Sequence, residues 1–275
     1  MWKDPTFVEN SVCRYFQWLQ LRSKSNTTIP IPEDVSFILK VHMLHPVDYK
    51  KVMNSLLHMN SPNLEHLVTL NPTEHRMGLF VKAWNDEFQE NINENSTKQI
   101  SNFEKFNVSG VNLIKSSLGQ AEFLTKLLSL SNNNVELILS DKFLGRAIED
   151  YRKFLYLRKV TPKENYIVPS MFIDLIWHSH MLSPMQYSVD TNFFVGQLLD
   201  HNDNIEDSAL KEDWNRTHIT WRMYYGEPLI AHNAEAYISS TKMPGKQKES
   251  KKIAKVPLDC EPLLSVDDGD ARSRR

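Results

Sequence analysis

The sequence predicts an all-α protein, a helical domain containing two pseudo-repeated helix-turn-helix units. Along most of the chain, apolar residues recur at spacings of three and four, which is the period of an amphipathic helix. The chain has only 8 glycines and few alternating β-branched runs, which argues against a sheet-rich fold and against a glycine-rich phosphate loop. A unit of roughly 35 residues also recurs, as is typical of a repeated supersecondary structure.

The composition indicates a protein that can build a core and that carries no strong charge of one sign. Of the 275 residues, 41% are hydrophobic and 10% are aromatic, which is enough for one large domain or two smaller ones. The formal net charge is −2, so no global basic field draws the protein onto nucleic acid or anionic lipid. The two cysteines, Cys13 and Cys260, lie at opposite ends of the chain and give no disulfide framework.

The chain shows no sign of a signal peptide or of a membrane span. Its first residues lack the apolar core of a signal peptide, and no later stretch approaches the roughly 18 uninterrupted apolar residues of a transmembrane helix. Together with the cysteine usage, this predicts a cytoplasmic or, alternatively, a nuclear location and no membrane partner.

Helices are expected in order along the first part of the chain. Residues 6–23 carry an apolar stripe, and a proline-bounded connector leads from them to a helix over residues 33–44. Pro46 then stands where the first residue of a new helix tolerates proline. The Asn-Pro-Thr turn at residues 71–73 offers the cap of a further helix.

The second part of the chain repeats the helical spacing with a larger apolar content. Helices are expected over residues 112–130 and 135–159, on either side of an asparagine-rich turn. Ser170 can cap the next helix, and Ser183-Pro184 restarts another. An acidic turn and a last long helix follow, which Gly226 closes.

These elements predict the following domain organisation. We expect a first helical unit over residues 1–90 and a second over residues 112–238, packed into one compact domain. The polar, asparagine-rich residues 91–111 are expected to form a loop that links the units. Residues 239–275 are charged, poor in aromatics and without period, so a disordered tail is expected there.

The two units match in order, spacing and chemistry. "YFQWLQLRS" at residues 15–23 aligns with "YRKFLYLRK" at residues 151–159 at an offset of 136. Further matches follow at an offset of 138, with a slip of two residues. They pair His42-Met43-Leu44 with His180-Met181-Leu182, Pro46 with Pro184 and Tyr49 with Tyr187. Because a helix pair buries most of these positions, the repeat predicts fold and leaves function open.

The second unit, "YRKFLYLRKVTPKENYIVPSMFIDLIWHSHMLSPMQY", resembles the glycine-rich domain-containing protein-like family (DUF1399) of plants and fungi. The following "DHND" at residues 200–203 resembles that family's His-Asp-rich turn. Two departures stand out: Leu39 and Lys40 occupy positions where the family's first unit has Trp and His, and the long glycine-rich C-terminal region of plant members is not expected here. The resemblance implies a helical fold and no defined biochemistry, with general links of plant members to development and stress responses.

The motif "IDLIWHSHMLSPMQY" at residues 173–187 holds the candidate site residues. On a helix, Asp174 and His178 share a face, whereas His178 and His180 lie about 200° apart and could not chelate one ion. On a strand the two histidines would face the same side. We favour the helix, with Trp177 in the core, His178 bonded to Asp174, and His180 bonded to a loose carbonyl near the helix end.

A metal site is the alternative that the sequence leaves open. Histidine nitrogen together with carboxylate oxygen suits zinc, iron or manganese. The candidate ligands are His178, His180, Asp174, Asp190, Asp200, His201 and Asp203.

The functional prediction is therefore a protein of unknown biochemical function, a non-enzymatic macromolecule-binding or scaffold protein. The alternative is a metal-dependent enzyme, hydrolase or oxygenase-like, that uses the His178/His180 motif. No cofactor is expected apart from a divalent metal under that alternative. We expect a protein partner; residues 242–255 hold six lysines, which could contact nucleic acid, but we favour a solvated tail.

Overall fold

The computed structural model describes seven stretches of the chain, and its regular structure there is helical throughout. The stretches are residues 2–24, 30–57, 74–88, 109–162, 165–201, 207–229 and 233–239. They contain 11 helices and no strand, which confirms the predicted all-α class. The helices are α1 (Pro5–Lys24), α2 (Glu33–Met43), α3 (Pro46–Leu57), α5 (Glu74–Phe88), α7 (Leu113–Leu130), α8 (Val135–Ile138), α9 (Asp141–Val160), α10 (Met171–Met181), α11 (Pro184–Val195), α12 (Asp207–Tyr225) and α13 (Ala234–Ser239).

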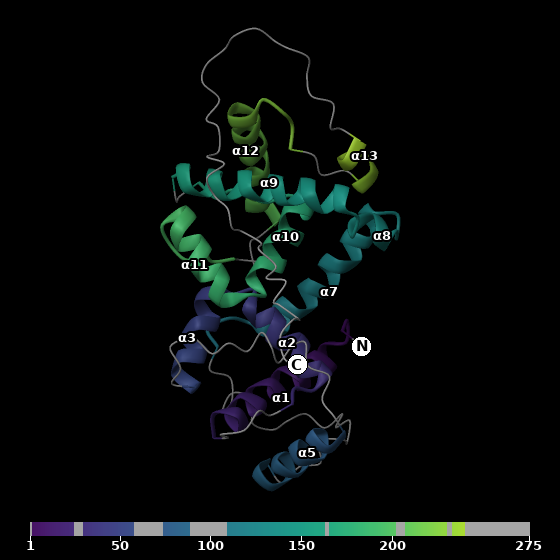
Figure 1. The fold of residues 1–275 in the computed structure, drawn as a ribbon, viewed down its shortest axis with the longest axis vertical. Helices are drawn as coiled ribbons and strands as arrows, with labels where there is room; N and C mark the ends of the chain where they lie inside the picture. The colour runs from purple at the N-terminus through teal and green to yellow at the C-terminus, as the bar shows by residue number, and fades with distance from the viewer. Residues whose placement is uncertain are drawn as a thin grey trace, which may run out of the picture.

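A first core lies among α1, α2, α3 and α5, at the lower end of the molecule in Figure 1. Glu33 and Asp34 stand in the first turn of α2, where negative charge is favourable beside the helix dipole. The helix ends at Met43, and α3 restarts at Pro46, as the sequence predicts. The largest fully buried side chains of this core are Tyr15, Trp18, Leu19 and Ile38, together with Trp84 at 1% exposure.

A second core forms where α9 packs against α10 and α11, with α12 and α13 on its other side (Figure 1). Ser140 caps α9, because its hydroxyl accepts a hydrogen bond from the Phe143 amide. The Tyr225 hydroxyl donates to the Lys153 carbonyl, and the Tyr237 hydroxyl donates to the Asp150 carboxylate. These bonds attach α12 and α13 to α9. The buried aromatic residues of this core include Phe143, Phe154, Phe172, Trp177, Tyr187, Trp221 and Tyr237.

Helix α7 joins the two cores. Its first half packs on the first core through Leu113, Ile114 and Leu118, whereas Phe123 and Leu127 pack on the second core. Figure 1 shows α7 running obliquely from the level of α2 to α8. One helix therefore makes the two cores continuous. Of the predicted linker, only its last residues are described, and the predicted tail beyond Ser239 and the cap at residues 71–73 lie outside the described residues.

Both halves contain a buried histidine held between a tyrosine and an aspartate. The Tyr15 hydroxyl bonds His42 Nδ1 at 2.7 Å, and His42 Nε2 lies 3.0 Å from Asp48 Oδ2. In the other half, the Tyr151 hydroxyl bonds His180 Nδ1 at 2.9 Å, and His180 Nε2 lies 3.0 Å from Asp190 Oδ2 on α11. These contacts give a physical reason for the recurring Tyr and His, because a buried imidazole needs partners for both nitrogens. That the halves form a true repeat remains a prediction.

None of the helices in the described part of the chain has the length and apolar character that a membrane crossing requires.

Candidate metal centre

The WHSH motif lies on α10, as the helix interpretation predicts. Ser170 caps the helix, with its hydroxyl 3.3 Å from the Ile173 amide nitrogen. The helix ends where the Leu182 amide bonds the His178 carbonyl, and α11 restarts at Pro184. On this helix His178 and His180 point to different surroundings. His178 packs against the ring of Phe123 from α7.

His201 reaches the same place from the connector that follows α11. Helix α11 ends at Gly196, whose φ of +89° is a left-handed conformation that glycine adopts without strain. The chain reverses there, and Leu199 is buried at 1% exposure. His201 then turns its ring towards α10, 23 residues after His178 in the sequence.

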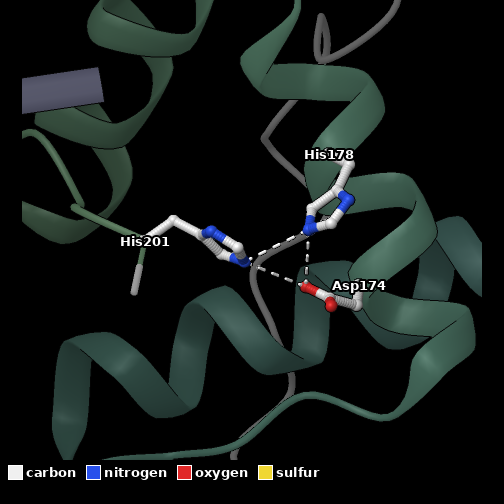
Figure 2. A group of neighbouring side chains, drawn as sticks. All are labelled: Asp174, His178 and His201. Atoms are coloured by element: carbon white, nitrogen blue, oxygen red, sulfur yellow. Dashed lines mark hydrogen bonds and ion pairs between the residues drawn. The ribbon is translucent and has the colours of Figure 1, made fainter. Parts of the chain in front are cut away.

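Three side chains point their polar atoms at one another, as Figure 2 shows. His178 Nε2 and His201 Nε2 are 3.2 Å apart. Asp174 Oδ1 lies 3.4 Å from each of these two nitrogens. The result is a nearly equilateral triangle of two nitrogens and one oxygen, from which one metal ion could take three ligands.

While Asp174 is ionised, no assignment of protons to the two Nε2 atoms makes all three contacts of this triangle attractive. If both Nε2 atoms carry hydrogen, two donors face each other at 3.2 Å. If only one carries hydrogen, the other presents its lone pair to the Asp174 carboxylate, and if neither does, three acceptors converge. Beyond these long contacts, the buried Asp174 Oδ1 accepts no hydrogen bond of ordinary geometry from the described residues. A cation at the centre would turn all three contacts into attractions.

The cluster is shielded from water. The side chains of His178, His201 and Asp174 are 9%, 4% and 17% exposed. The Trp177 ring meets His201 edge to face at 4.8 Å, and Phe123 covers His178 at 4.7 Å. Burial raises the pKa of Asp174, but the two neighbouring histidines outweigh it and bring that pKa below its ordinary value. The carboxylate is therefore ionised at neutral pH.

The other candidate ligands lie away from this cluster or outside the described residues. His180 was expected to bond a backbone carbonyl near the end of its helix. It bonds the side chains of Tyr151 and Asp190 instead, because α11 brings the Asp190 carboxylate within 3.0 Å of His180 Nε2. Asp190 also accepts a hydrogen bond from Gln186. The Asp200 side chain is exposed and is not part of the cluster, and Asp203 lies outside the described residues.

The sequence indicated part of this arrangement. The spacing of four between Asp174 and His178 placed them on one helix face, and the resemblance drew attention to His201. Sequence reasoning did not find Phe123, which is one of several apolar residues on α7 and carries no local signal. Nor did it find the hydrogen bond from Trp177 Nε1 to the Tyr187 hydroxyl, at 2.8 Å.

Fold and cluster together describe a helical protein with a buried site of two histidines and one carboxylate. Residues 68–190 match the sequence model of the family described as "Glycine-rich domain-containing protein-like". This match includes Asp174 and His178 and stops before His201. Over these residues, which are just under half of the chain, the protein is similar to that family, whose biochemical function is not established.

Two curated relatives come from Arabidopsis thaliana. Glycine-rich domain-containing protein 1 is 27% identical over 245 residues, which are 81% of this chain and 29% of the relative. Glycine-rich domain-containing protein 2 is 33% identical over 94 residues, which are 32% of this chain and 12% of the relative. The chain thus spans less than a third of the length of either relative. No solved structure matches it.

Proposed function

We propose that this protein binds one divalent transition-metal ion through Asp174, His178 and His201, with zinc as the best fit. The observation that carries the proposal is the triangle of converging atoms, in which no proton assignment makes all three contacts attractive while Asp174 is ionised. Imidazole nitrogen and carboxylate oxygen are ordinary zinc ligands. An ionised Asp174 supplies the negative charge that such an ion needs.

The size of the triangle supports a tetrahedral ion. With bonds of about 2.0–2.1 Å, the ligand atoms of a tetrahedral zinc ion lie about 3.3–3.4 Å apart. An octahedral ion with bonds of about 2.1 Å would bring neighbouring ligands to about 3.0 Å. The separations of 3.2, 3.4 and 3.4 Å are closer to the tetrahedral values.

Among the described residues three ligands converge, and this number favours a reactive site over a purely structural one. Structural zinc sites are closed by four protein ligands, whereas catalytic ones use three and leave the fourth position to water or substrate. Zinc lowers the pKa of bound water to about 7, which supplies hydroxide for hydrolysis. Two histidines and one carboxylate can also hold Fe(II) for oxygen chemistry. Hydrolysis is the class that the proposed tetrahedral geometry supports.

A comparison of the two matched sequence units supports a specialised second unit. At the offset of 138, Ser36 and Lys40 align with Asp174 and His178. The first unit thus lacks both helical ligands but keeps His42, the counterpart of His180. What the units share is the packing histidine with its tyrosine, and what they do not share are the proposed ligands.

The test is metal analysis of the purified full chain beside single variants. The parent, loaded with Zn²⁺ and desalted, is expected to retain close to one ion per chain by mass spectrometry. His178→Ala and His201→Ala are expected to retain little. His218→Ala is the matched control, because His218 lies on α12 against Trp214 and outside the cluster. Equal zinc in all four proteins, or none in the folded parent, would contradict the proposal.

The scaffold hypothesis retains one supporting observation. Met185, Val189 and Phe193 stand four residues apart on α11 and are 44%, 63% and 76% exposed. An exposed apolar stripe of this kind is typical of a protein-binding surface. Partner capture by the parent, compared with a Val189→Lys, Phe193→Glu double variant, tests it; equal capture by both would argue against a role for this stripe.

A further inference from the structure

A buried hydrogen-bond chain runs from α10 to the segment that carries His201. Trp177 Nε1 donates to the Tyr187 hydroxyl at 2.8 Å, and that hydroxyl donates to the Leu199 carbonyl at 3.0 Å. Trp177 and Tyr187 are both 0% exposed, and Leu199 is 1% exposed. Burial raises the pKa of Tyr187 well above its ordinary value, so its hydroxyl keeps the proton that it donates.

We infer that Tyr187 is a positioning residue for the metal centre: its hydroxyl fixes the backbone two residues before His201 and so sets where the His201 ring lies. This inference rests on the proposed metal function. The described residues that lead up to His201, 196–200, form neither helix nor strand, so the placement of its ring depends on tertiary contacts. Groups that orient a metal ligand from behind commonly change metal affinity 10- to 100-fold when they are removed.

These hydrogen bonds link the two segments that supply the proposed ligands, α10 and the connector that carries His201. Trp177 precedes His178 on α10, and its ring also meets His201 edge to face. One indole therefore contacts the His201 ring and, through Tyr187, bonds the backbone that bears it. In the first sequence unit, Leu39 takes the place of Trp177 and offers no N–H donor. The Trp-Tyr pair thus occurs in the unit that has the proposed ligands.

The experiment uses Co²⁺ as a spectroscopic probe in the full chain. Tyr187→Phe removes one hydroxyl and keeps the ring, while Tyr49→Phe makes the same change at the aligned position of the first unit. Both Tyr49 and Tyr187 are buried, at 3% and 0% exposure. We expect Tyr187→Phe to weaken Co²⁺ binding about 10- to 100-fold and to alter the visible absorption of the bound ion. Tyr49→Phe is expected to leave affinity and spectrum unchanged.

The outcomes separate this inference from the proposal beneath it. If the parent binds Co²⁺ and folded Tyr187→Phe binds it equally with the same spectrum, the inference is wrong and the metal site stands. If the folded parent binds neither Co²⁺ nor Zn²⁺, the proposed function itself fails. Equal weakening by both variants would show a general packing effect and would also overturn the inference. Should Tyr187→Phe not fold, Trp177→Phe replaces it, and an unchanged Co²⁺ affinity there has the same meaning.

Discussion

Replacing Trp177 by leucine, the residue that the first unit carries at the aligned position, tests packing and site together. The indole is fully buried between the second core and the cluster. Its ring lies 4.9 Å from Phe154 and 4.8 Å from His201, and its N–H bonds Tyr187. Leucine keeps an apolar side chain on α10 but removes all three of these interactions.

The expected loss of unfolding free energy is about 3–4 kcal/mol. The smaller side chain leaves a cavity of about 60 Å³, which at about 24 cal/mol per Å³ costs about 1.5 kcal/mol. The lost hydrogen bond adds about 1 kcal/mol. The lost aromatic contacts add about 0.5–1.5 kcal/mol. This total lies at the lower end of the range for truncating a buried tryptophan to alanine, because leucine fills part of the space.

Urea unfolding followed by circular dichroism measures the effect, first with chelator and then with Zn²⁺. At a Zn²⁺ concentration of about 100 times the dissociation constant, the parent is expected to gain about 2.7 kcal/mol. Trp177→Leu should gain much less, because His201 loses its neighbour. Trp84→Leu is the control, since Trp84 is 1% exposed in the first core. A loss below about 1 kcal/mol for Trp177→Leu, or equal zinc gains in both variants, would refute this reasoning.

Three further predictions concern charge. Burial lowers the pKa of His42, so as the pH falls the unfolded chain takes up a proton at this residue before the folded protein does. The contribution of the neutral His42 to stability is therefore complete above about pH 6.5 and declines below it by at most about 1.4 kcal/mol per pH unit. Urea titrations at pH 7.5, 6.5 and 5.5 should show a flatter decline of the unfolding free energy for His42→Gln than for the parent. Asp48 binds the Ser109 hydroxyl and the Gly110 amide besides His42, so Asp48→Asn should cost about 1.5–3 kcal/mol at pH 7 in thermal unfolding, and no measurable loss would contradict this. Because metal ligands must be deprotonated, Zn²⁺ affinity by competition titration should fall between pH 7.5 and 5.5, and a pH-independent affinity would argue against histidine ligation.

The helices were predictable from the sequence because their signals are local. The spacing of apolar residues, the cap at Ser170 and the prolines at Pro46 and Pro184 all act within one or two turns. The structure places α2, α10 and α11 where these signals indicate. That α7 packs on both cores could not be predicted from the sequence. Its two halves look alike in sequence, and only the tertiary structure shows that Leu113 and Leu127 belong to different cores.

The site was predictable only as far as helix geometry reaches. A helix separates His178 from His180 and brings His178 onto the face of Asp174, and both follow from the period of 3.6 residues. Which distant group completes the cluster depends on the reversal at Gly196 and on the packing of the connector. His201 was therefore one of several equal candidates in the sequence. The same holds for Asp190, whose pairing with His180 requires α11 to fold back on α10.

The most direct test of the metal centre is a crystal structure of the zinc-loaded full chain with anomalous data collected on both sides of the zinc absorption edge. The metal hypothesis predicts one strong anomalous peak at about 2.0–2.2 Å from Asp174 Oδ1, His178 Nε2 and His201 Nε2, with a tetrahedral arrangement that includes one further ligand. A peak at other residues, or no peak between α10 and the His201 segment in protein that holds zinc, would contradict it.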